Sequence, residues 1–148
     1  MNAELSKSLN AIGLKAKNAS AILNTATSAQ KNKFFDLAIA AIQENAEEIL
    51  AANQIDIKAA KDNGKDDAFI DRLALDKSRL QGICNTLIDI KSFEDPVGRE
   101  LASWQRPNGL NISRVATPLG VIGLIFESRP NVAADAGGLC LKSGNAVI

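Results

Sequence analysis

The first 92 residues contain no proline, and their apolar side chains recur at steps of three and four residues. Two runs with this spacing are Leu5, Leu9, Ile12, Ala16 and Ala19, and Phe34, Leu37, Ala38, Ala41 and Ile42. Such spacing places apolar side chains on one face of an α-helix, and no proline interrupts the helical hydrogen bonds. This part of the chain is therefore predicted to fold as a series of helices.

Short polar residues and one glycine mark the predicted boundaries of these helices. The start signals are Ser28, Asn45 with Glu48 in capping-box spacing, and Asp76, and the stop signal is Gly64 after Asn63. Ser, Asn and Asp side chains accept hydrogen bonds from the unpaired N–H groups of a first helical turn. Glycine supplies the left-handed residue that often follows a last turn.

From residue 95 the pattern changes to turn-forming residues and short apolar or β-branched runs. The sequence Pro107-Asn108-Gly109 predicts the turn of a β-hairpin, with strands at residues 100–106 and 110–117. Residues 120–126 then form a continuous apolar run, residues 132–143 have helical length, and residues 145–148 resume a strand. These last segments predict a right-handed, parallel βαβ unit.

The sequence therefore predicts an α/β fold in three parts. Residues 1–94 are helical, residues 95–117 form the hairpin, and residues 118–148 begin a βαβ unit that is incomplete. A parallel sheet needs further strands and cover on both faces, so we expect that the chain is interrupted inside this unit.

Composition argues against several classes of protein. The chain has 17 basic and 17 acidic residues, one Trp, five Phe and no Tyr, which gives little surface for binding nucleic acid. Residues 121–126, the longest strongly apolar run, are too few to span a bilayer, and no signal peptide precedes them, so a cytoplasmic protein is expected. The absence of histidine and the wide spacing of two cysteines exclude a Cys/His zinc site, and no metal is expected.

Two segments closely resemble the signature region of γ-glutamyl phosphate reductases, a family within the aldehyde dehydrogenase superfamily. They are residues 117–131, Thr-Pro-Leu-Gly-Val-Ile-Gly-Leu-Ile-Phe-Glu-Ser-Arg-Pro-Asn, and residues 139–148, Leu-Cys-Leu-Lys-Ser-Gly-Asn-Ala-Val-Ile. Residues 13–20, 70–75 and 95–98 extend the resemblance in order along the chain. The resemblance implies that residues 118–148 open a Rossmann-type NADP-binding domain, that residues 1–94 are its helical part, and that the hairpin is an oligomerisation arm.

The reaction that this resemblance implies is the reduction of L-glutamyl 5-phosphate by NADPH to L-glutamate 5-semialdehyde and phosphate, in proline biosynthesis. A cysteine thiolate of the enzyme displaces phosphate, and hydride reduces the resulting thioester. In the family this cysteine lies beyond Ile148, so the isolated chain is expected to be inactive. A homo-oligomeric full-length enzyme and functional coupling to glutamate 5-kinase are also implied, whereas a fused kinase is disfavoured because the resemblance begins near Met1.

The resemblance assigns roles to five residues. Asn131 is the side-chain amide that stabilises the oxyanion, although its position also suits a helix N-cap. Arg129 contacts the substrate phosphate or the cofactor, or is a solvated loop arginine. Ile125, Phe126 and Glu127 form a strand exit that runs beside NADP(H), mainly through backbone groups, or are ordinary residues of the strand.

Cysteines and glycines in the helices are interpreted as packing residues. Cys140 lies among apolar residues in the predicted helix with no histidine to activate it, and Cys84 shares a face with leucines, so both are expected to be buried and inert. Gly137 and Gly138 each weaken that helix by about 1 kcal/mol relative to alanine and permit close approach to the sheet.

Two other functions stay open on the sequence alone. One is a different acyl-phosphate reductase of the aldehyde dehydrogenase type, against which the Glu-Ser-Arg-Pro-Asn turn at residues 127–131 argues. The other is a non-catalytic remnant that acts as an interaction module, which would require a stable fold with a closed sheet edge.

Overall fold

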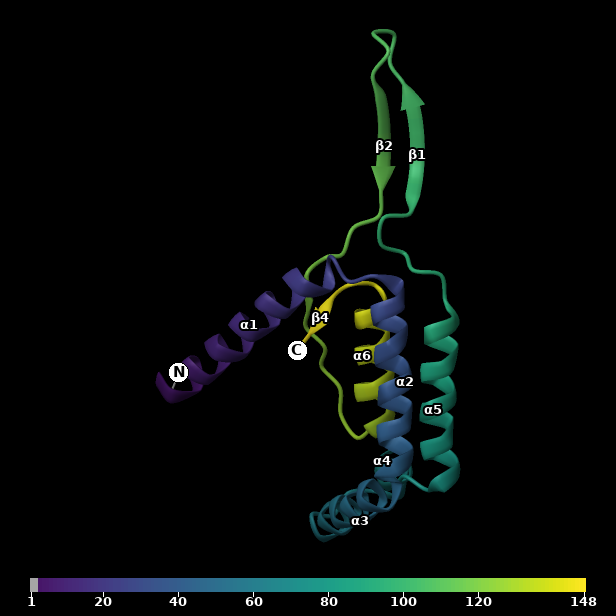
Figure 1. Ribbon diagram of the computed structural model, residues 1–148. Helices are drawn as coiled ribbons and strands as arrows, with labels where there is room; N and C mark the ends of the chain where they lie inside the picture. Colours follow the sequence, from purple (N-terminus) through teal and green to yellow (C-terminus); the bar gives the residue numbers. More distant parts are fainter. Residues whose placement is uncertain (1–2) are drawn as a thin grey trace.

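The computed structural model describes residues 3–148, and its elements follow the predicted order (Figure 1). The helices that come first are α1 (Ala3–Leu23), α2 (Ser28–Glu44), α3 (Ala46–Asp62), α4 (Asp67–Leu73) and α5 (Lys77–Ser92). A hairpin of β1 (Glu100–Gln105) and β2 (Asn111–Val115) follows, and then β3 (Val121–Ile122), α6 (Pro130–Lys142) and β4 (Ala146–Val147). The predicted α/β fold is confirmed.

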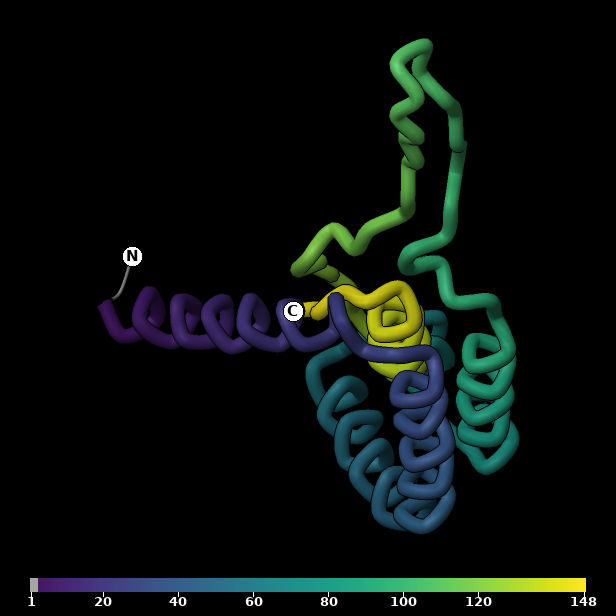
Figure 2. Tube along the Cα trace, turned by 45° about the horizontal axis from the view of Figure 1, so that its top comes forward, coloured from purple at the N-terminus to yellow at the C-terminus, as the bar shows by residue number. Residues whose placement is uncertain are grey.

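Helices α2, α5 and α6 lie side by side and form the body of the molecule (Figures 1 and 2). Helix α1 extends away from this body and packs against β3 and β4, while α3 packs with α4 near one end of the body. The β1–β2 hairpin projects from the opposite end. Among residues 3–148, no helix is both long and apolar enough to cross a membrane.

The core lies where these three helices meet. Phe35 of α2 is fully buried, and Leu87 and Ile90 of α5 are 3% exposed. Helix α5 buries residues at helical spacing, namely Leu80, Ile83, Cys84, Leu87 and Ile90. Burial of each large apolar side chain contributes about 1.5–3 kcal/mol, so this seam is the main source of apolar stabilisation in the body.

Gly138 allows α6 to approach the other two helices closely. A Cβ atom at this position would lie 3.1 Å from Leu87 Cδ2 and 3.3 Å from both Ile90 Cδ1 and Phe35 Cε1. A Cβ atom at Gly137 would meet nothing within 4 Å. The predicted close approach to the sheet is therefore wrong: the glycine that permits contact faces α2 and α5, because the core lies between helices.

Helix boundaries follow the predicted signals in part. Asp76 caps α5 by accepting a hydrogen bond from the Arg79 N–H, and Gly64 follows α3 with φ +70°. The capping residue of α2 is Thr27 rather than Ser28, because Thr27 and Gln30 form a reciprocal capping box. The predicted helix start at Asp76 and the predicted stop at Gly64 are confirmed. The capping residue predicted at Ser28 is wrong by one residue.

The capping box expected at Asn45 does not form. Asn45 also ends α2, and its side-chain Nδ2 donates to the Ala41 carbonyl at 2.7 Å. Its backbone, at φ −102° and ψ 18°, is not in the extended conformation in which an N-cap side chain reaches the next turn. The side chain therefore completes the preceding helix instead of starting the following one.

The hairpin forms at the predicted turn. Strands β1 and β2 pair antiparallel, and Gly109 N–H donates to the Arg106 carbonyl at 2.9 Å to close the turn. Strand β2 ends at Val115, earlier than the predicted residue 117. Most of the hairpin's side chains are exposed, because the hairpin stands clear of the body.

The βαβ unit is parallel as predicted, but its strands are short. Strand β3 pairs with β4 at Val121 and Ile122, and the pairing extends as far as the Leu124 N–H, which donates to the Ile148 carbonyl at 2.8 Å. The strand predicted for residues 120–126 is thus wrong beyond Leu124, since residues 125 and 126 have no strand beside them to pair with. Helix α6 starts at Pro130, two residues earlier than predicted.

The turn between α6 and β4 requires a glycine. Gly144 has φ +75°, and a Cβ atom there would lie 2.8 Å from Pro118 Cγ and 3.1 Å from Val97 Cγ2. The predicted end of the helix at residues 142–144 is therefore confirmed. The next residue, Asn145, is buried, and its Oδ1 accepts from the Gly120 N–H at 2.9 Å, which joins this turn to the start of β3.

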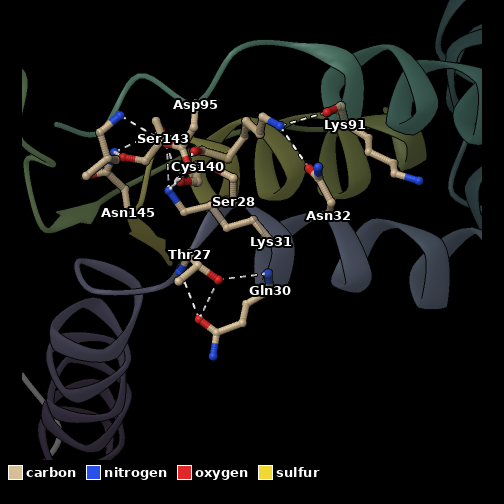
Figure 3. Close-up of polar contacts among 12 residues, drawn as sticks. Thr27, Ser28, Gln30, Lys31, Asn32, Lys91, Asp95, Cys140, Ser143 and Asn145 are labelled. Atoms are coloured by element: carbon tan, nitrogen blue, oxygen red, sulfur yellow. Dashed lines mark hydrogen bonds and ion pairs between the residues drawn. The ribbon is translucent and has the colours of Figure 1, made fainter. Parts of the chain in front are cut away.

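A buried ion pair joins α2, the segment after α5 and the end of α6 (Figure 3). Lys31 is 2% exposed, and its Nζ lies 2.9 Å from both carboxylate oxygens of Asp95 and 3.2 Å from the Lys142 carbonyl. Burial raises the pKa of the Asp95 carboxyl, but hydrogen bonds from Lys31, the Val97 N–H and Ser28 outweigh burial and lower the pKa below its usual value. The charged form of Asp95 is therefore the form that the fold stabilises.

Lys142 adds a second buried ammonium group beside this pair. Its Nζ donates to Asn32 Oδ1 at 3.0 Å and to the Lys91 carbonyl at 2.7 Å (Figure 3). Burial lowers the pKa of Lys142, the Asp95 carboxylate raises it, and the positive charges of Lys31 and Lys91 lower it further. These contacts tie the last turn of α6 to both α2 and α5.

We predict that Asp95→Asn destabilises the chain by about 3 kcal/mol at neutral pH, because it leaves the buried Lys31 ammonium without its counter-charge. Asp95 has a lowered pKa in the folded state, so its contribution is present above the unfolded-state value of about 3.9 and is lost as pH falls through the folded-state pKa. Urea unfolding followed by circular dichroism measures the difference at each pH.

The control is Asp62→Asn, which removes an exposed pair with Lys58 and is expected to cost about 1 kcal/mol or less. If Asp95→Asn cost no more than the control, or if its cost did not shrink on acidification, the buried pair would not stabilise the fold as described.

Neighbouring glycines in α6 provide a matched pair of substitutions. Gly137→Ala is expected to stabilise the chain by about 0.5–1 kcal/mol through helix propensity, since its Cβ meets open space. Gly138→Ala is expected to be about 1–3 kcal/mol less stable than Gly137→Ala, because its Cβ overpacks the core. Equal melting temperatures for the two variants would contradict the close packing of α6.

Candidate functional site

A cleft of about 440 Å³ lies between the first turn of α6 and the α4–α5 region. Its charged lining residues are Asp71, Arg72, Arg79, Arg129 and Asp135. Asn131 and Pro130 complete the wall formed by α6, and residues of α5, among them Gly82 and Thr86, form the facing wall. Two residues predicted from the sequence, Arg129 and Asn131, therefore share one cleft.

The start of α6 is set by three consecutive residues. Ser128 adopts φ +52°, a left-handed conformation that turns the chain from the exit of β3 into the helix. Pro130 follows at the first position of the helix, where a missing N–H costs nothing. Arg129 is the N-cap and its side chain makes no capping bond, so the alternative role of Asn131 as an N-cap is wrong.

Asn131 is held by Asp135, one turn further along α6. Asn131 Nδ2 donates to Asp135 Oδ2 at 2.7 Å, which leaves the second N–H of the amide free for another acceptor. The other carboxylate oxygen, Asp135 Oδ1, is buried and has no hydrogen-bond partner among the described residues. Asp135 thus uses one carboxylate oxygen to orient Asn131, while its other oxygen is shielded from solvent.

The three arginines of the cleft differ in their contacts. Arg79 is fixed, because its guanidinium lies 2.7 Å from Asp71 Oδ1, 2.9 Å from the Ala74 carbonyl, and also donates to the Asp71 carbonyl. The side chains of Arg72 and Arg129 make no ion pair or hydrogen bond within residues 3–148. Both guanidinium groups are thus available to an anionic ligand.

Ile125, Phe126 and Glu127 lie outside this cleft, on the segment that links β3 to α6. Ile125 is fully exposed, Phe126 is 48% exposed, and the Glu127 carboxylate lies 3.8 Å from Lys65 Nζ. Within the described chain, the backbone groups of residues 125–127 form no hydrogen bonds, so they are free to bind a ligand. The structure therefore places these three residues apart from Arg129 and Asn131, which line the cleft.

Neither cysteine is placed to act as a nucleophile. Cys84 and Cys140 are 1% and 8% exposed and do not line the cleft. Burial raises the pKa of both thiols, which keeps the thiolate fraction small at neutral pH. Among residues 3–148 there is also no group of three or more His, Cys, Asp or Glu side chains that could hold a metal ion.

Sequence reasoning missed Asp71, Arg72, Arg79 and Asp135 as members of the site. A signal for Asp135 was present, because it follows Asn131 by four residues and therefore lies on the same helix face. Asp71 and Arg72 lie in residues 70–75, which belong to the resemblance, but nothing in the sequence placed them or Arg79 near residue 129, because the two regions are far apart along the chain.

Comparison with known proteins gives consistent matches. The chain is 51% identical over all 148 residues to the gamma-glutamyl phosphate reductase of Brucella suis biovar 1 (strain 1330), and covers 35% of that protein. It is 51% identical over 137 residues to the enzyme of the same name from Parvibaculum lavamentivorans, covering 93% of the chain and 32% of that protein. No protein-family model matches the chain.

Solved structures show the same similarity. The crystal structure of gamma-glutamyl phosphate reductase from Thermotoga maritima matches 90% of the chain and 32% of its own length, with a TM-score of 0.87 and 40% identity. The structure from Saccharomyces cerevisiae matches 89% of the chain and 34% of its own length, with a TM-score of 0.85 and 35% identity.

These matches first define a class: the chain has the fold of the amino-terminal part of a group of mixed α/β reductases. Within that class, it is homologous to γ-glutamyl phosphate reductases. The chain spans about a third of the length of the curated relatives that it matches.

Burial of both cysteines predicts their reactivity. Cys84 and Cys140 are expected to react with a chromogenic disulfide reagent at least about 100-fold more slowly in the native chain than in urea, because thiolates are scarce in buried sites. The absorbance of the released thiol measures both rates, with free cysteine as the control. Rapid labelling of one thiol under native conditions would contradict the packing role assigned to it.

Proposed function

We propose that this chain is the amino-terminal part of an enzyme that reduces L-glutamyl 5-phosphate to L-glutamate 5-semialdehyde and phosphate, with NADPH as reductant. The observation that carries the proposal is 51% identity to a γ-glutamyl phosphate reductase over every residue of the chain. The cleft supports it, since Arg129 and Asn131, which the resemblance assigns to the site, face the same cavity. The balanced reaction consumes NADPH and a proton and releases NADP⁺.

Asn131 is the proposed donor to the oxyanion that develops when the acyl carbon of the substrate is attacked. One N–H of its amide is bound to Asp135, which fixes the orientation of the side chain. The second N–H is free, and a pre-oriented donor of this kind lowers the barrier because it needs no reorganisation during the reaction.

Arg129 is the proposed contact for the substrate phosphate. Its guanidinium has no partner within residues 3–148 and lies at the edge of the same cleft. A planar guanidinium donates two parallel hydrogen bonds to a phosphate group and carries its charge at all relevant pH values.

Residues 125–127 are the proposed neighbours of NADP(H). Their backbone N–H and C=O groups are unpaired and exposed beside the cleft, which suits a ligand that is bound mainly through main-chain contacts. The nicotinamide supplies the hydride when it is bound. The part of the chain between β3 and α6 would thus hold the cofactor, and the first turn of α6 would hold the substrate.

The nucleophile is proposed to be a cysteine outside these 148 residues, which forms the thioester that hydride then reduces. The two cysteines of this chain are buried, and burial raises the pKa of each thiol. The 148-residue chain alone is therefore expected to show no turnover.

The remaining proposals concern the setting of the enzyme. The exposed β1–β2 hairpin serves as an oligomerisation arm of a homo-oligomer, because its paired strands project from the body. The reaction belongs to proline biosynthesis in the cytoplasm, where glutamate 5-kinase supplies L-glutamyl 5-phosphate.

A chimera tests the function directly. Residues 1–148 replace the matching third of the Brucella suis enzyme, and the reverse reaction is followed by NADPH formation from L-glutamate 5-semialdehyde, phosphate and NADP⁺. Turnover by the chimera is expected, and a folded chimera without turnover would reject the proposed function. The isolated chain, assayed in the same way, is the inactive control.

In this chimera, Asn131→Ala is expected to lower kcat by about 10²–10³-fold, the typical effect of removing one oxyanion donor. Asn10→Ala, an exposed substitution on α1, is the matched control and should leave kcat unchanged. A loss confined to KM would indicate that Asn131 binds the ground state of the substrate rather than the oxyanion.

A further inference from the structure

The segment that joins α4 to α5 is held from two sides. Asn53 of α3 is 4% exposed, and its side chain donates to the Leu73 carbonyl at 2.9 Å and accepts from the Leu75 N–H at 2.7 Å. From the other side, the Arg79 guanidinium of α5 donates to two carbonyls of the same segment. A buried amide bonded to the backbone in two places and an arginine on the last carbonyls of α4 fix the conformation of this turn.

Arg72 lies inside this fixed segment, but its own side chain is free. It belongs to the last turn of α4 and lines the cleft. The neighbouring Asp71 carboxylate is bound by Arg79, and the Arg72 guanidinium makes no ion pair or hydrogen bond within residues 3–148. A free cation on a fixed backbone binds an anion at a lower entropic cost, because little of the chain has to be ordered on binding.

The charges of the cleft leave two cations for a ligand. Asp71 and Arg79 pair with each other, and the Asp135 carboxylate bonds to an amide of its own helix. The guanidinium groups that are left, on Arg72 and Arg129, belong to separate elements, α4 and the N-cap of α6. Two cations on separate elements around a cleft of about 440 Å³ suit a small ligand with an anionic group at each end.

The reacting end of the proposed substrate belongs at the first turn of α6. In L-glutamyl 5-phosphate the phosphate is bonded to the acyl carbon, so the donor to the oxyanion and the phosphate contact must be neighbours, as Asn131 and Arg129 are. A helix N-terminus also favours an anionic group. The α-carboxylate is at the other end of the substrate, and Arg72 is the unpaired cation that remains for it among the described lining residues.

We infer that Arg72 is a specificity-determining residue that binds the α-carboxylate of the L-glutamyl group, while Arg129 binds the phosphate. The inference rests on the proposed function and adds the recognition of the amino-acid end of the substrate. A guanidinium donates two parallel hydrogen bonds to a carboxylate, so a ligand without that carboxylate loses a charge-assisted contact.

A titration of the 148-residue chain, followed by ¹⁵N NMR, tests the inference with two stable probes. In 6-phosphonohexanoate, the carboxylate and the phosphorus are separated by as many atoms as in L-glutamyl 5-phosphate, and hexylphosphonate has a methyl group in place of that carboxylate. 6-Phosphonohexanoate is expected to bind about tenfold more tightly, with amide shifts at residues 71–75 that hexylphosphonate does not produce. This comparison needs no variant and so does not depend on the folding of one.

Substitutions of single cations separate the two ends of the ligand. Arg72→Gln is expected to bring the two affinities within about twofold of each other, whereas Arg129→Gln is expected to weaken both probes about equally and to keep their ratio. Lys61→Gln is the matched control, because Lys61 is an exposed basic residue in the last turn of α3, as Arg72 is in α4, and it should retain the full preference.

Equal binding of the two probes by the unmodified chain would overturn the inference. So would an unchanged preference in Arg72→Gln, or the absence of shifts at residues 71–75 with 6-phosphonohexanoate.

The chimera provides a second readout that a merely structural role of Arg72 would not produce. In the reverse reaction the carboxylate and the phosphate arrive on different substrates. Arg72→Gln is therefore expected to raise the KM for L-glutamate 5-semialdehyde about tenfold and to leave the KM for phosphate and kcat within about twofold. Arg129→Gln is expected to raise the KM for phosphate instead. Equal effects of Arg72→Gln on both KM values, or an effect on kcat alone, would contradict the role assigned to Arg72.

Failure of the inference is distinguishable from failure of the proposed function. An active chimera whose KM for L-glutamate 5-semialdehyde is unaffected by Arg72→Gln would retain the reductase and reject the role of Arg72. A folded chimera without turnover would reject the reductase itself, whatever the titration shows.

Discussion

The ion pair between Lys31 and Asp95 is the contact on which the arrangement of the helices depends. A buried ammonium group is tolerated only with a counter-charge and hydrogen bonds, and here these come from the segment after α5 and from the end of α6. The pair therefore fixes three separate parts of the chain at one point. Lys142 reinforces it by bonding the last turn of α6 to both neighbouring helices. These contacts hold the last turn of α6, and Gly138 packs against the core. The position of α6 is thereby fixed, and its first turn lines the cleft.

The candidate site follows from that placement of α6. Asn131 and Asp135 come from a single helix face, whereas the arginines come from α4, α5 and the N-cap of α6. Loop and helix-end residues thus meet on a scaffold of packed helices, which is the usual setting for binding residues. The charges are unevenly paired, because Asp71 forms an ion pair with Arg79 and with neither of the other two arginines. The Arg72 and Arg129 side chains are left without an ion pair within residues 3–148.

Local pattern predicted much of the fold but not its details. The cap at Asp76 and the turn at Pro107-Asn108-Gly109 depend on neighbours in sequence, so the residues themselves determine them. Thr27 and Ser28 are both good N-cap residues. Thr27 is the cap because its backbone N–H donates to the Gln30 side chain, while the Ser28 hydroxyl donates to Asp95 instead. The Asn45 side chain bonds to the preceding helix rather than to the following one. The apolar run at residues 120–126 forms only a short strand, because its second half has no neighbouring strand to pair with. In the site, Arg129 and Asn131 were predicted as binding residues, but their common cleft with Arg72 and Arg79 was not.

The sequence by itself determined the helical first part, the hairpin turn, the parallel βαβ unit and the resemblance to γ-glutamyl phosphate reductases, because periodicity, turn residues and motifs are local properties of the chain. Tertiary structure alone decided that Gly138 faces helices, that Lys31 and Asp95 are paired inside the protein, and that Asp135 has one buried oxygen with no donor among residues 3–148. Each of these depends on contacts between residues that are distant in sequence, or on how closely one helix approaches another. Packing and desolvation set the energy of such contacts, and neither is encoded in any short stretch of residues.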